Sequence, residues 1–163
     1  MKNTLKFAAL LLVLCILLGS FAGCSKKTEI STDAFKTAAE ELGYVVHDVS
    51  DGYDSAVIDK CWTARYKDNG EVIESYDLDY QFLFMHFTSN LNAEADFEKV
   101  VKDFTVVGSN VEKKYTNGDT QYYEITTSTQ YLRVVRVGTS MFYVHCGPSF
   151  KEDAVALAEK IGY

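Results

Sequence analysis

Hydrophobic residues recur at helical spacing near the start of the folded part of the chain. Between residues 31 and 44, the residues Phe35, Ala38, Ala39 and Leu42 fall at i, i+3, i+4 and i+7, which is the spacing of an amphipathic helix. Serine and threonine precede this stripe and glycine follows it, as expected for the two ends of a helix. The pattern predicts a helix with one apolar face that packs on another element.

Two more helices with this spacing are expected later in the chain. One lies within residues 92–104, with Asn92 as a candidate N-cap, acids early and lysines late to suit the helix dipole. Its apolar positions are Phe97, Val100, Val101 and Phe104. The other lies within residues 148–163, where Pro148 suits a first turn. Its apolar positions are Phe150, Ala154, Leu157, Ala158 and Ile161.

Between the helices the hydrophobic period changes to two. Residues 72–87 alternate between a row that runs from Tyr76 to His86 and a second row that runs from Asp77 to Met85, as in a strand. The run KDNGE before them predicts a hairpin turn that joins them to residues 55–66. Four more short strands are expected, at residues 111–115, 120–127, 130–137 and 141–146. Short strands with tight turns favour an antiparallel sheet.

This order of elements predicts an α+β domain, with an antiparallel sheet of about six or seven strands covered on one face by three helices. A weak internal sequence similarity adds a second expectation. AAEELGY, ending at Tyr44, is similar to LAEKIGY, ending at Tyr163, and residues 83–101 are similar to residues 141–160. This internal similarity suggests two ββα units related by a pseudo-twofold axis. The alternative is coincidence, because helices often end in similar residues.

The first 23 residues have the composition of an export signal. Lys2 and Lys6 precede twelve uninterrupted apolar residues, and small residues then lead to a cysteine, which gives a positive segment, an apolar segment and a cleavage site. A transmembrane helix needs about 20 apolar residues, whereas residues 7–23 supply seventeen only if glycine and serine are counted. An uncleaved anchor is the alternative. Both interpretations place the rest of the chain outside the cytoplasmic membrane.

The run FAGC, from Phe21 to Cys24, resembles the lipobox of bacterial lipoproteins, although that family usually has Leu where Phe21 stands. The resemblance implies cleavage just before Cys24 and a diacylglyceryl group, with palmitate-like chains, on its thiol; two acyl chains anchor a protein stably. The layout also resembles small uncharacterised lipoproteins of Gram-positive, Firmicute-type bacteria. It implies a signal peptide at 1–23, a lipidated cysteine and tether at 24–31, and a single α+β domain at 32–163, lipid-anchored on the extracytoplasmic face of the cell membrane.

Charge narrows the range of partners. The chain has 16 basic and 23 acidic side chains, and removal of Lys2 and Lys6 with the leader leaves 14 basic ones and a net charge of −9. Such a surface is repelled by phosphate backbones and by anionic headgroups. Nucleic acid is therefore not an expected partner, and only Lys26 and Lys27, beside the anchor, are expected to contact lipid headgroups favourably.

Two cysteines remain after processing, Cys61 and Cys146, because Cys15 leaves with the leader and Cys24 carries the lipid. Outside the membrane an even number of cysteines favours a disulfide, so we expect these two to be bonded. Two buried thiols are the alternative. A catalytic thiol is disfavoured because neither cysteine has an activating sequence context.

Few residues point to catalysis or to a metal, and no cofactor is expected. His86 and His145 hold equivalent places in the two proposed units, so they could face each other and ligate zinc together with an acid; histidines satisfied by hydrogen bonds are the preferred interpretation. Asp48, Asp51 and Asp54 are spaced three apart and Asp59 follows, unlike the acids of a helix–loop–helix calcium loop. A solvated turn is the preferred interpretation, and calcium in an irregular loop is the alternative. Asp77 and Asp79 share one strand face, where solvated acids are favoured over a glycosidase pair.

Tyrosine is abundant, with eleven residues in the chain. Packing across strands is the preferred role for these rings. On an uncovered sheet face, Tyr76, Tyr80, Tyr122 and Tyr131 would instead form a platform for a sugar ring or a peptide strand. The expected function is therefore a non-catalytic binding or interaction module with a protein or glycan ligand. The alternative is a metal-binding or hydrolytic surface protein with its site near the two strand-end histidines.

Overall fold

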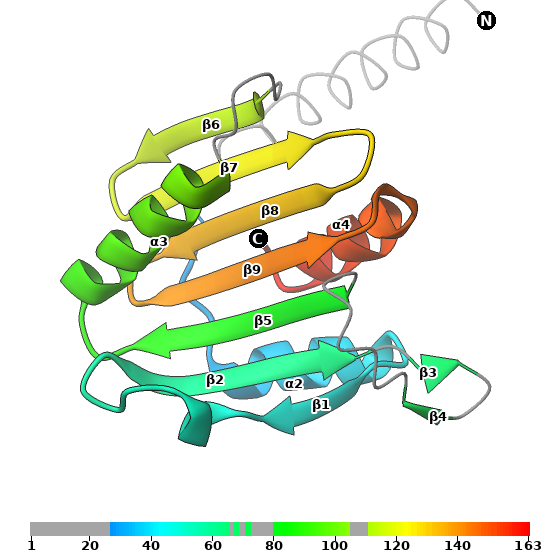
Figure 1. Cartoon of the computed structure of the whole chain (residues 1–163). Coiled ribbons are helices and arrows are strands. Elements are labelled where there is room, and N and C mark those ends of the chain that lie inside the picture. Colours follow the sequence, from blue (N-terminus) through cyan, green and yellow to red (C-terminus); the bar gives the residue numbers. More distant parts are fainter. Residues whose placement is uncertain (1–26, 66, 69–70, 73–79, 105–110) are drawn as a thin grey trace, which may run out of the picture.

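The computed structural model describes residues 27–65, 67–68, 71–72, 80–104 and 111–163 (Figure 1). These residues form a seven-stranded antiparallel sheet, a small two-stranded hairpin and three α-helices, which confirms the predicted α+β class. The helices are α2 (Thr32–Glu41), α3 (Asn90–Phe104) and α4 (Lys151–Lys160), with 3-10 turns η1 (Ser50–Gly52) and η2 (Pro148–Phe150). The strands are β1 (Val45–Asp48), β2 (Ile58–Arg65), β3 (Lys67–Asp68), β4 (Glu71–Val72), β5 (Tyr80–Phe87), β6 (Val111–Asn117), β7 (Thr120–Thr126), β8 (Tyr131–Val137) and β9 (Ser140–Cys146).

The first predicted helix is confirmed as α2. Ser31 is its N-cap, because the side chain accepts a hydrogen bond from the Ala34 nitrogen at 3.2 Å and so satisfies a terminal N–H group. Gly43 follows the helix with a φ of +87°, a left-handed conformation that glycine adopts without strain. Phe35 and Ala39 on the apolar stripe are fully buried.

The other two helices begin differently from the prediction. The main-chain nitrogen of Asn92 donates to Oγ of Ser89 at 3.2 Å, so the helix starts before Asn92 and its first turn contains no acid. The prediction of Asn92 as the cap was wrong because serine and asparagine are both favourable caps and both occur here. Pro148 lies in η2, and α4 starts only at Lys151.

The large sheet has the strand order β1-β2-β5-β9-β8-β7-β6, and every neighbouring pair is antiparallel. At its centre Phe84 of β5 lies opposite both Trp62 of β2 and Phe142 of β9. The predicted alternation is confirmed for residues 82–87 of β5, whereas its part from 73 to 79 lies outside the described residues. Two details differ. β1 was not predicted, and the short β3 and β4 pair with each other while β2 pairs directly with β5.

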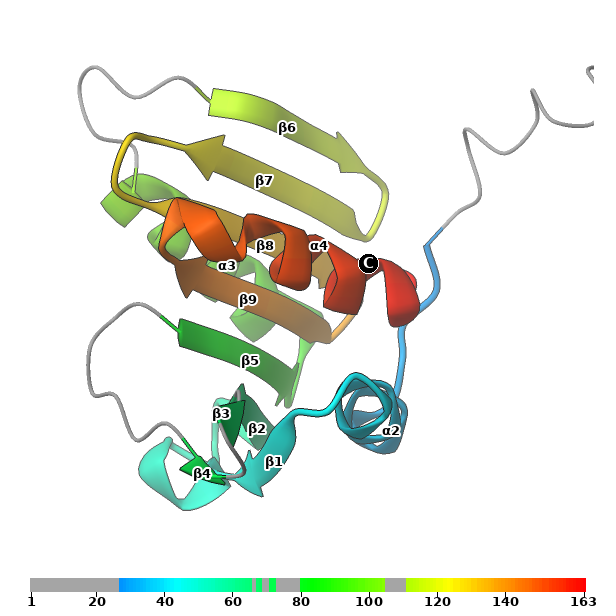
Figure 2. The same cartoon turned by 90° about the vertical axis from the view of Figure 1, so that its right-hand side faces the viewer.

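Helices cover both faces of the sheet, not one face as predicted (Figure 2). α2 and α4 pack on one face, in a core that we call the α2/α4 core, whereas α3 packs on the other face, in the α3 core. Every residue of β8 is buried, and a strand that is apolar on both sides needs cover on both sides. The α2/α4 core is built around Phe35, Phe82, Phe84, Phe142, Leu157 and Tyr163. The α3 core is built around Phe87, Phe97, Tyr123, Leu132, Val134 and Met141.

The two ββα units are not related by a twofold axis. β5 and β9 are antiparallel neighbours at the centre of the sheet, so a twofold axis between them would run perpendicular to the sheet and keep the following helices on one face. α3 follows β5 onto one face, and α4 follows β9 onto the other. The symmetry therefore extends to the order of strands but not to the helices.

The same division separates the two cysteines. Cys61 of β2 is fully buried in the α3 core, whereas Cys146 of β9 is buried in the α2/α4 core. The sheet lies between them, and a disulfide requires Cα atoms within about 7 Å and side chains directed at each other. The predicted Cys61–Cys146 disulfide is therefore wrong, and both residues are buried thiols.

Part of the predicted tether is folded against the domain. Nζ of Lys27 donates to the main-chain oxygens of Gly162 and Tyr163 at 3.0 and 2.9 Å. The Ile30 nitrogen donates to the Tyr163 hydroxyl at 3.2 Å, and the Thr139 nitrogen donates to the Glu29 carboxylate at 3.2 Å. Residues 27–30 thus lie fixed beside the end of α4 and the β8–β9 turn, and we call these contacts the tether clamp.

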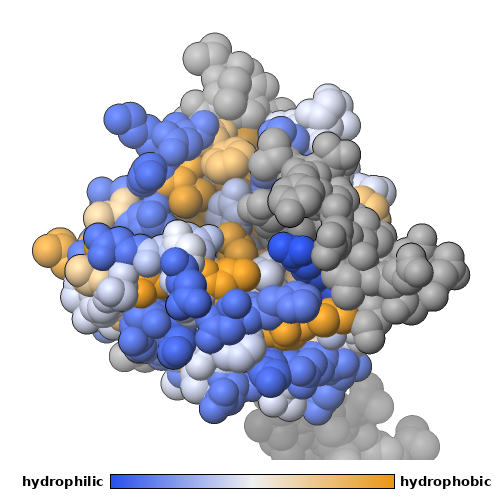
Figure 3. Space-filling model, turned by 60° about the horizontal axis from the view of Figure 1, so that its bottom comes forward, coloured by the Kyte–Doolittle hydropathy of each residue, from blue (hydrophilic) through white to orange (hydrophobic). Residues whose placement is uncertain are grey.

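The β1 edge of the domain is largely hydrophilic. On the face that Figure 3 shows, hydrophilic side chains predominate and apolar ones form small separate areas between them. Leu42 and Tyr53 are partly exposed large apolar residues, at 39% and 37%. Small scattered apolar areas are normal on a protein surface, so the described residues on this face form no broad apolar site.

Candidate binding surface

Aromatic and basic side chains from four elements meet on the α2/α4 face of the sheet. They come from β6, β7, β8 and the start of α4, which lie side by side here. We call the group Lys113, Tyr115, Tyr122, Arg133 and Lys151 the basic–aromatic surface. It lies in a protein whose net charge is −7, so its excess of cations is a local feature.

A pair of stacked tyrosines forms the centre of this surface. The rings of Tyr115 on β6 and Tyr122 on β7 are parallel within 5°, with centroids 5.0 Å apart. Tyr122 is buried, whereas 43% of Tyr115 is exposed. The Arg133 guanidinium carbon lies 5.2 Å from the centroid of the Tyr122 ring, within the range of a cation–π contact. A flat aromatic ring backed by a second ring and a cation is thus open to solvent.

Lysines flank this stack on both sides of a buried acid. Glu124, which is only 4% exposed, accepts a hydrogen bond from the Tyr122 hydroxyl and lies 3.9 Å from Nζ of Lys151. Lys113 lies opposite Glu124 in the β6–β7 register and is exposed. Alternate residues of a strand share a face, so Lys113 lies on the same face as Tyr115. Lys151 also lies 5.2 Å from the Tyr131 ring centroid.

Two buried polar groups beneath the surface lack hydrogen bonds of good geometry. They are Nε of Arg133 and the hydroxyl of Tyr131, which lie near each other. The other end of the guanidinium is occupied, because Nη2 of Arg133 donates to the main-chain oxygen of Tyr163 at 2.9 Å. The Tyr131 hydroxyl and the Arg133 guanidinium therefore interact mainly with each other beneath the surface.

The phenols of this surface remain protonated near neutral pH. Burial raises the pKa of Tyr122 above its usual range, and its hydrogen bond to Glu124 adds to the shift. Burial likewise raises the pKa of Tyr131, and the Glu124 charge adds to it. Protonated phenols donate hydrogen bonds and stack, but they are weak bases and nucleophiles. The arrangement is therefore suited to binding.

The four predicted ligand tyrosines do not form one platform. Tyr122 and Tyr131 are buried, at 4% and 0% exposure, and they pack beneath the surface. Tyr80 begins β5 opposite Cys146, and its side chain is outside the described part of the structure, as is all of Tyr76. The exposed ring is Tyr115, which the sequence did not single out because nothing in the spacing shows that its neighbour ring is buried.

His86 and His145 lie apart. His86 is on the α2/α4 side of β5, where Nε2 is 3.6 Å from the Glu29 carboxylate and Nδ1 is 3.4 Å from that of Asp59. His145 lies on the α3 side of β9, against the ring of Phe104. Being on opposite faces, the two histidines cannot share one ion, so the predicted alternative of a joint site is not supported. The residues described here contain no group of three or more His, Cys, Asp or Glu able to hold a metal.

The acid-rich run near β1 is a local turn. A carboxylate oxygen of Asp48 accepts from the Ser50 nitrogen at 2.9 Å, and one of Asp54 accepts from the Ala56 nitrogen at the same distance. These bonds are typical of aspartate in turns. The interpretation as a solvated turn therefore agrees with the structure, whereas Asp77 and Asp79 lie outside the described residues.

The buried thiol of Cys61 is a weak nucleophile. Burial raises its pKa to about 11, so almost none is thiolate at neutral pH. The Tyr53 hydroxyl beside it has a pKa of about 12, raised chiefly by burial. A protonated thiol is a poor nucleophile.

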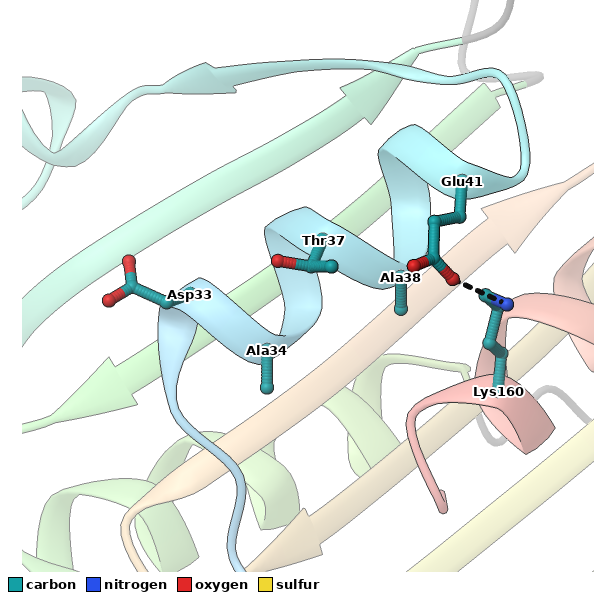
Figure 4. Close-up of a pocket in the computed structure, with 6 residues that line it drawn as sticks. All are labelled: Asp33, Ala34, Thr37, Ala38, Glu41 and Lys160. Atoms are coloured by element: carbon teal, nitrogen blue, oxygen red, sulfur yellow. Dashed lines mark ion pairs between the residues drawn. The ribbon is translucent and has the colours of Figure 1, made fainter.

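A shallow hollow lies beside α2 (Figure 4), and a second one lies beside His86 and the tether. The first is lined by Asp33, Ala34, Thr37, Ala38, Glu41 and Lys160. An ion pair of 2.8 Å between Lys160 and Glu41 crosses its end and links α4 to α2. The short side chains of Ala34, Thr37 and Ala38 on α2 leave this space.

Comparison with protein families, curated proteins and solved structures gives no match for this chain. Within the described ranges, no helix combines the length and the apolar character needed to cross a bilayer.

Proposed function

We propose that the protein is a lipid-anchored, extracytoplasmic and non-catalytic binding module. Its acyl chains are attached at Cys24, and its ligand binds at the basic–aromatic surface. The ligand carries negative charge, on a glycan, a protein or a lipid. One observation carries the binding part of this proposal: the half-exposed ring of Tyr115 stacks on Tyr122, whose ring in turn lies against the Arg133 guanidinium.

The chemistry of the surface supports binding over catalysis. Arg133 and two lysines supply positive charge around a flat ring, which suits an anionic group next to a ring or an apolar face. The titratable groups there are phenols with raised pKa values and one buried carboxylate that is already bound by Tyr122 and Lys151. None of these is an available general base.

The anchoring part rests on the leader and on its lipobox-like FAGC run. Metabolic labelling with an alkyne fatty acid tests it. The wild-type chain should incorporate the label, the Cys24→Ala variant should not, and Cys61→Ala serves as the matched control that keeps it. Equal labelling of the wild type and Cys24→Ala would refute acylation at this residue.

The binding part is tested with the full-length protein in neutral detergent on immobilised dextran sulfate, with uncharged dextran as reference. The wild type should be retained on the sulfated matrix at low salt and released as salt screens the charges. Lys113→Glu should elute much earlier, whereas Lys114→Glu, the next residue but on the opposite sheet face, should behave nearly as the wild type. Identical elution of these two variants would reject the basic–aromatic surface as the site.

A further inference from the structure

The tether clamp fixes how far the domain lies from its anchor. Lys27 is bonded to the main-chain oxygens of Gly162 and Tyr163, and it follows Cys24 by three residues in the sequence. Three Cα–Cα steps span at most about 11 Å. A lipidated Cys24 at the headgroup level would therefore hold Lys27 within about that distance of the membrane, which is close to the Debye length of about 8 Å at physiological salt.

The clamp is continuous with the basic–aromatic surface. The Tyr163 oxygen that accepts from Lys27 also accepts from Arg133, and Arg133 lies over the Tyr122 ring. Figure 2 shows the tether, the C-terminus and the end of β6 on the same side of the domain. The structure thus brings the surface and the anchor point together.

The clamp also engages Lys27, one of the two lysines that were expected to contact lipid. Lys27 points into the domain, where burial and the nearby Arg133 lower its pKa. The exposed cation of the basic–aromatic surface is instead Lys113, beside the exposed ring of Tyr115 on β6. Lys151 is part-buried and paired with Glu124. Lysines near an anionic membrane each strengthen binding by roughly fivefold, and tyrosine favours the membrane–water interface.

From these observations we propose that anionic phospholipid headgroups of the anchoring membrane are the ligand of the basic–aromatic surface. The proposal rests on the proposed function, because it takes acylation of Cys24 as given. The clamp removes most of the freedom of the tether, so the domain lies on the bilayer with Tyr115 and Lys113 toward the headgroups. The opposite face, with α3, then faces the exterior.

Adjacent residues of β6 provide the test without any mutation. Lys113 and Lys114 are both exposed, and they lie on opposite faces of the sheet because strand residues alternate. The acylated full-length protein is reconstituted into vesicles of phosphatidylcholine alone or with one third phosphatidylglycerol. A water-soluble amine-acylating reagent is added, and the rate of modification at each lysine is read by mass spectrometry, with Lys99 of α3 as a second reference.

On vesicles with phosphatidylglycerol, Lys113 should react at least fivefold more slowly than on phosphatidylcholine, while Lys114 and Lys99 keep their rates. Salt at about 1 M, where the Debye length is about 3 Å, should restore Lys113. Equal rates of Lys113 and Lys114 on both vesicles would overturn the proposal and point to a soluble glycan or protein ligand. Failure of acylation is a separate result, because unacylated protein would not float with vesicles of either composition.

Discussion

The hydroxyl of Tyr163 accepts a hydrogen bond from the main-chain nitrogen of Ile30 at 3.2 Å, across 133 positions of the chain. The same hydroxyl is hydrogen-bonded to Ser140, so one side chain joins the tether, α4 and β9. Tyr163 is 1% exposed, and its ring contacts that of Phe84 in the α2/α4 core. The two ends of the described chain are therefore part of one packed unit.

Replacing Tyr163 with Phe should destabilise the fold by about 1–2 kcal/mol, because the part-buried Ile30 nitrogen loses its acceptor. Tyr123→Phe is the matched control: its hydroxyl is buried without a hydrogen bond, so its removal should be neutral or slightly stabilising. Urea denaturation of both variants measures the difference. A Tyr123→Phe loss as large as that of Tyr163→Phe would contradict this account of the clamp.

Two glycines in hairpin turns test the contribution of Glu29. Gly138 and Gly118 both have a φ near +60°, so alanine should cost each about 1 kcal/mol of backbone strain. At Gly138 the added Cβ would also meet the Glu29 carboxylate, whereas at Gly118 nothing lies within 4 Å. Gly138→Ala should therefore release the tether and speed trypsin cleavage after Lys27, and Gly118→Ala should not. Equal cleavage rates would show that Glu29 does not hold the tether.

Alkaline pH should destabilise the protein. Burial raises the pKa of Tyr53 and of Tyr143 to about 12 and that of Cys61 to about 11. The folded state therefore keeps protons that the unfolded chain releases from about pH 9 upward, and stability falls as pH rises from about 9 to 12. Denaturation midpoints at pH 8, 10 and 11 measure the fall, which should be smaller in Tyr143→Phe. A midpoint that stays constant up to pH 11 would contradict the burial of these groups.

Thiol chemistry distinguishes the structure from the disulfide expected from the sequence. Cys61 and Cys146 are buried on opposite faces of the sheet. Without any reductant, alkylation should label neither cysteine in the native protein and both after unfolding in urea. A chain that stays unlabelled in urea until a reductant is added would have a disulfide, and the two-core arrangement would then be wrong.

The helices and most strands could be predicted because their signals are local. The stripe of α2 and the alternation within β5 are read directly from neighbouring residues, as is the turn glycine at Gly118. β1 was missed because its four residues are half-buried or exposed, which gives no alternation. The choice of face for each helix depends on long-range packing that periodicity does not encode. The sequence of β8 gave one local sign of cover on both faces, because it is apolar or aromatic except at its arginines.

The binding surface could not be predicted for the same reason. Tyr122 and Tyr131 were identified as tyrosines of a sheet, but only the register of β6 on β7 shows that Tyr115 covers Tyr122. Arg133 and Lys151 come from elements that meet only in the fold. The disulfide prediction was wrong for the same reason, since the count of cysteines says nothing about which face of the sheet each one occupies.

Acylation of Cys24 is the claim on which location, orientation and ligand all depend. The intact mass of the wild-type protein from the membrane fraction tests it most directly. The account predicts a chain that begins at Cys24 and carries the added mass of a diacylglyceryl group. A chain that begins at Met1 with an unmodified Cys24 would contradict it.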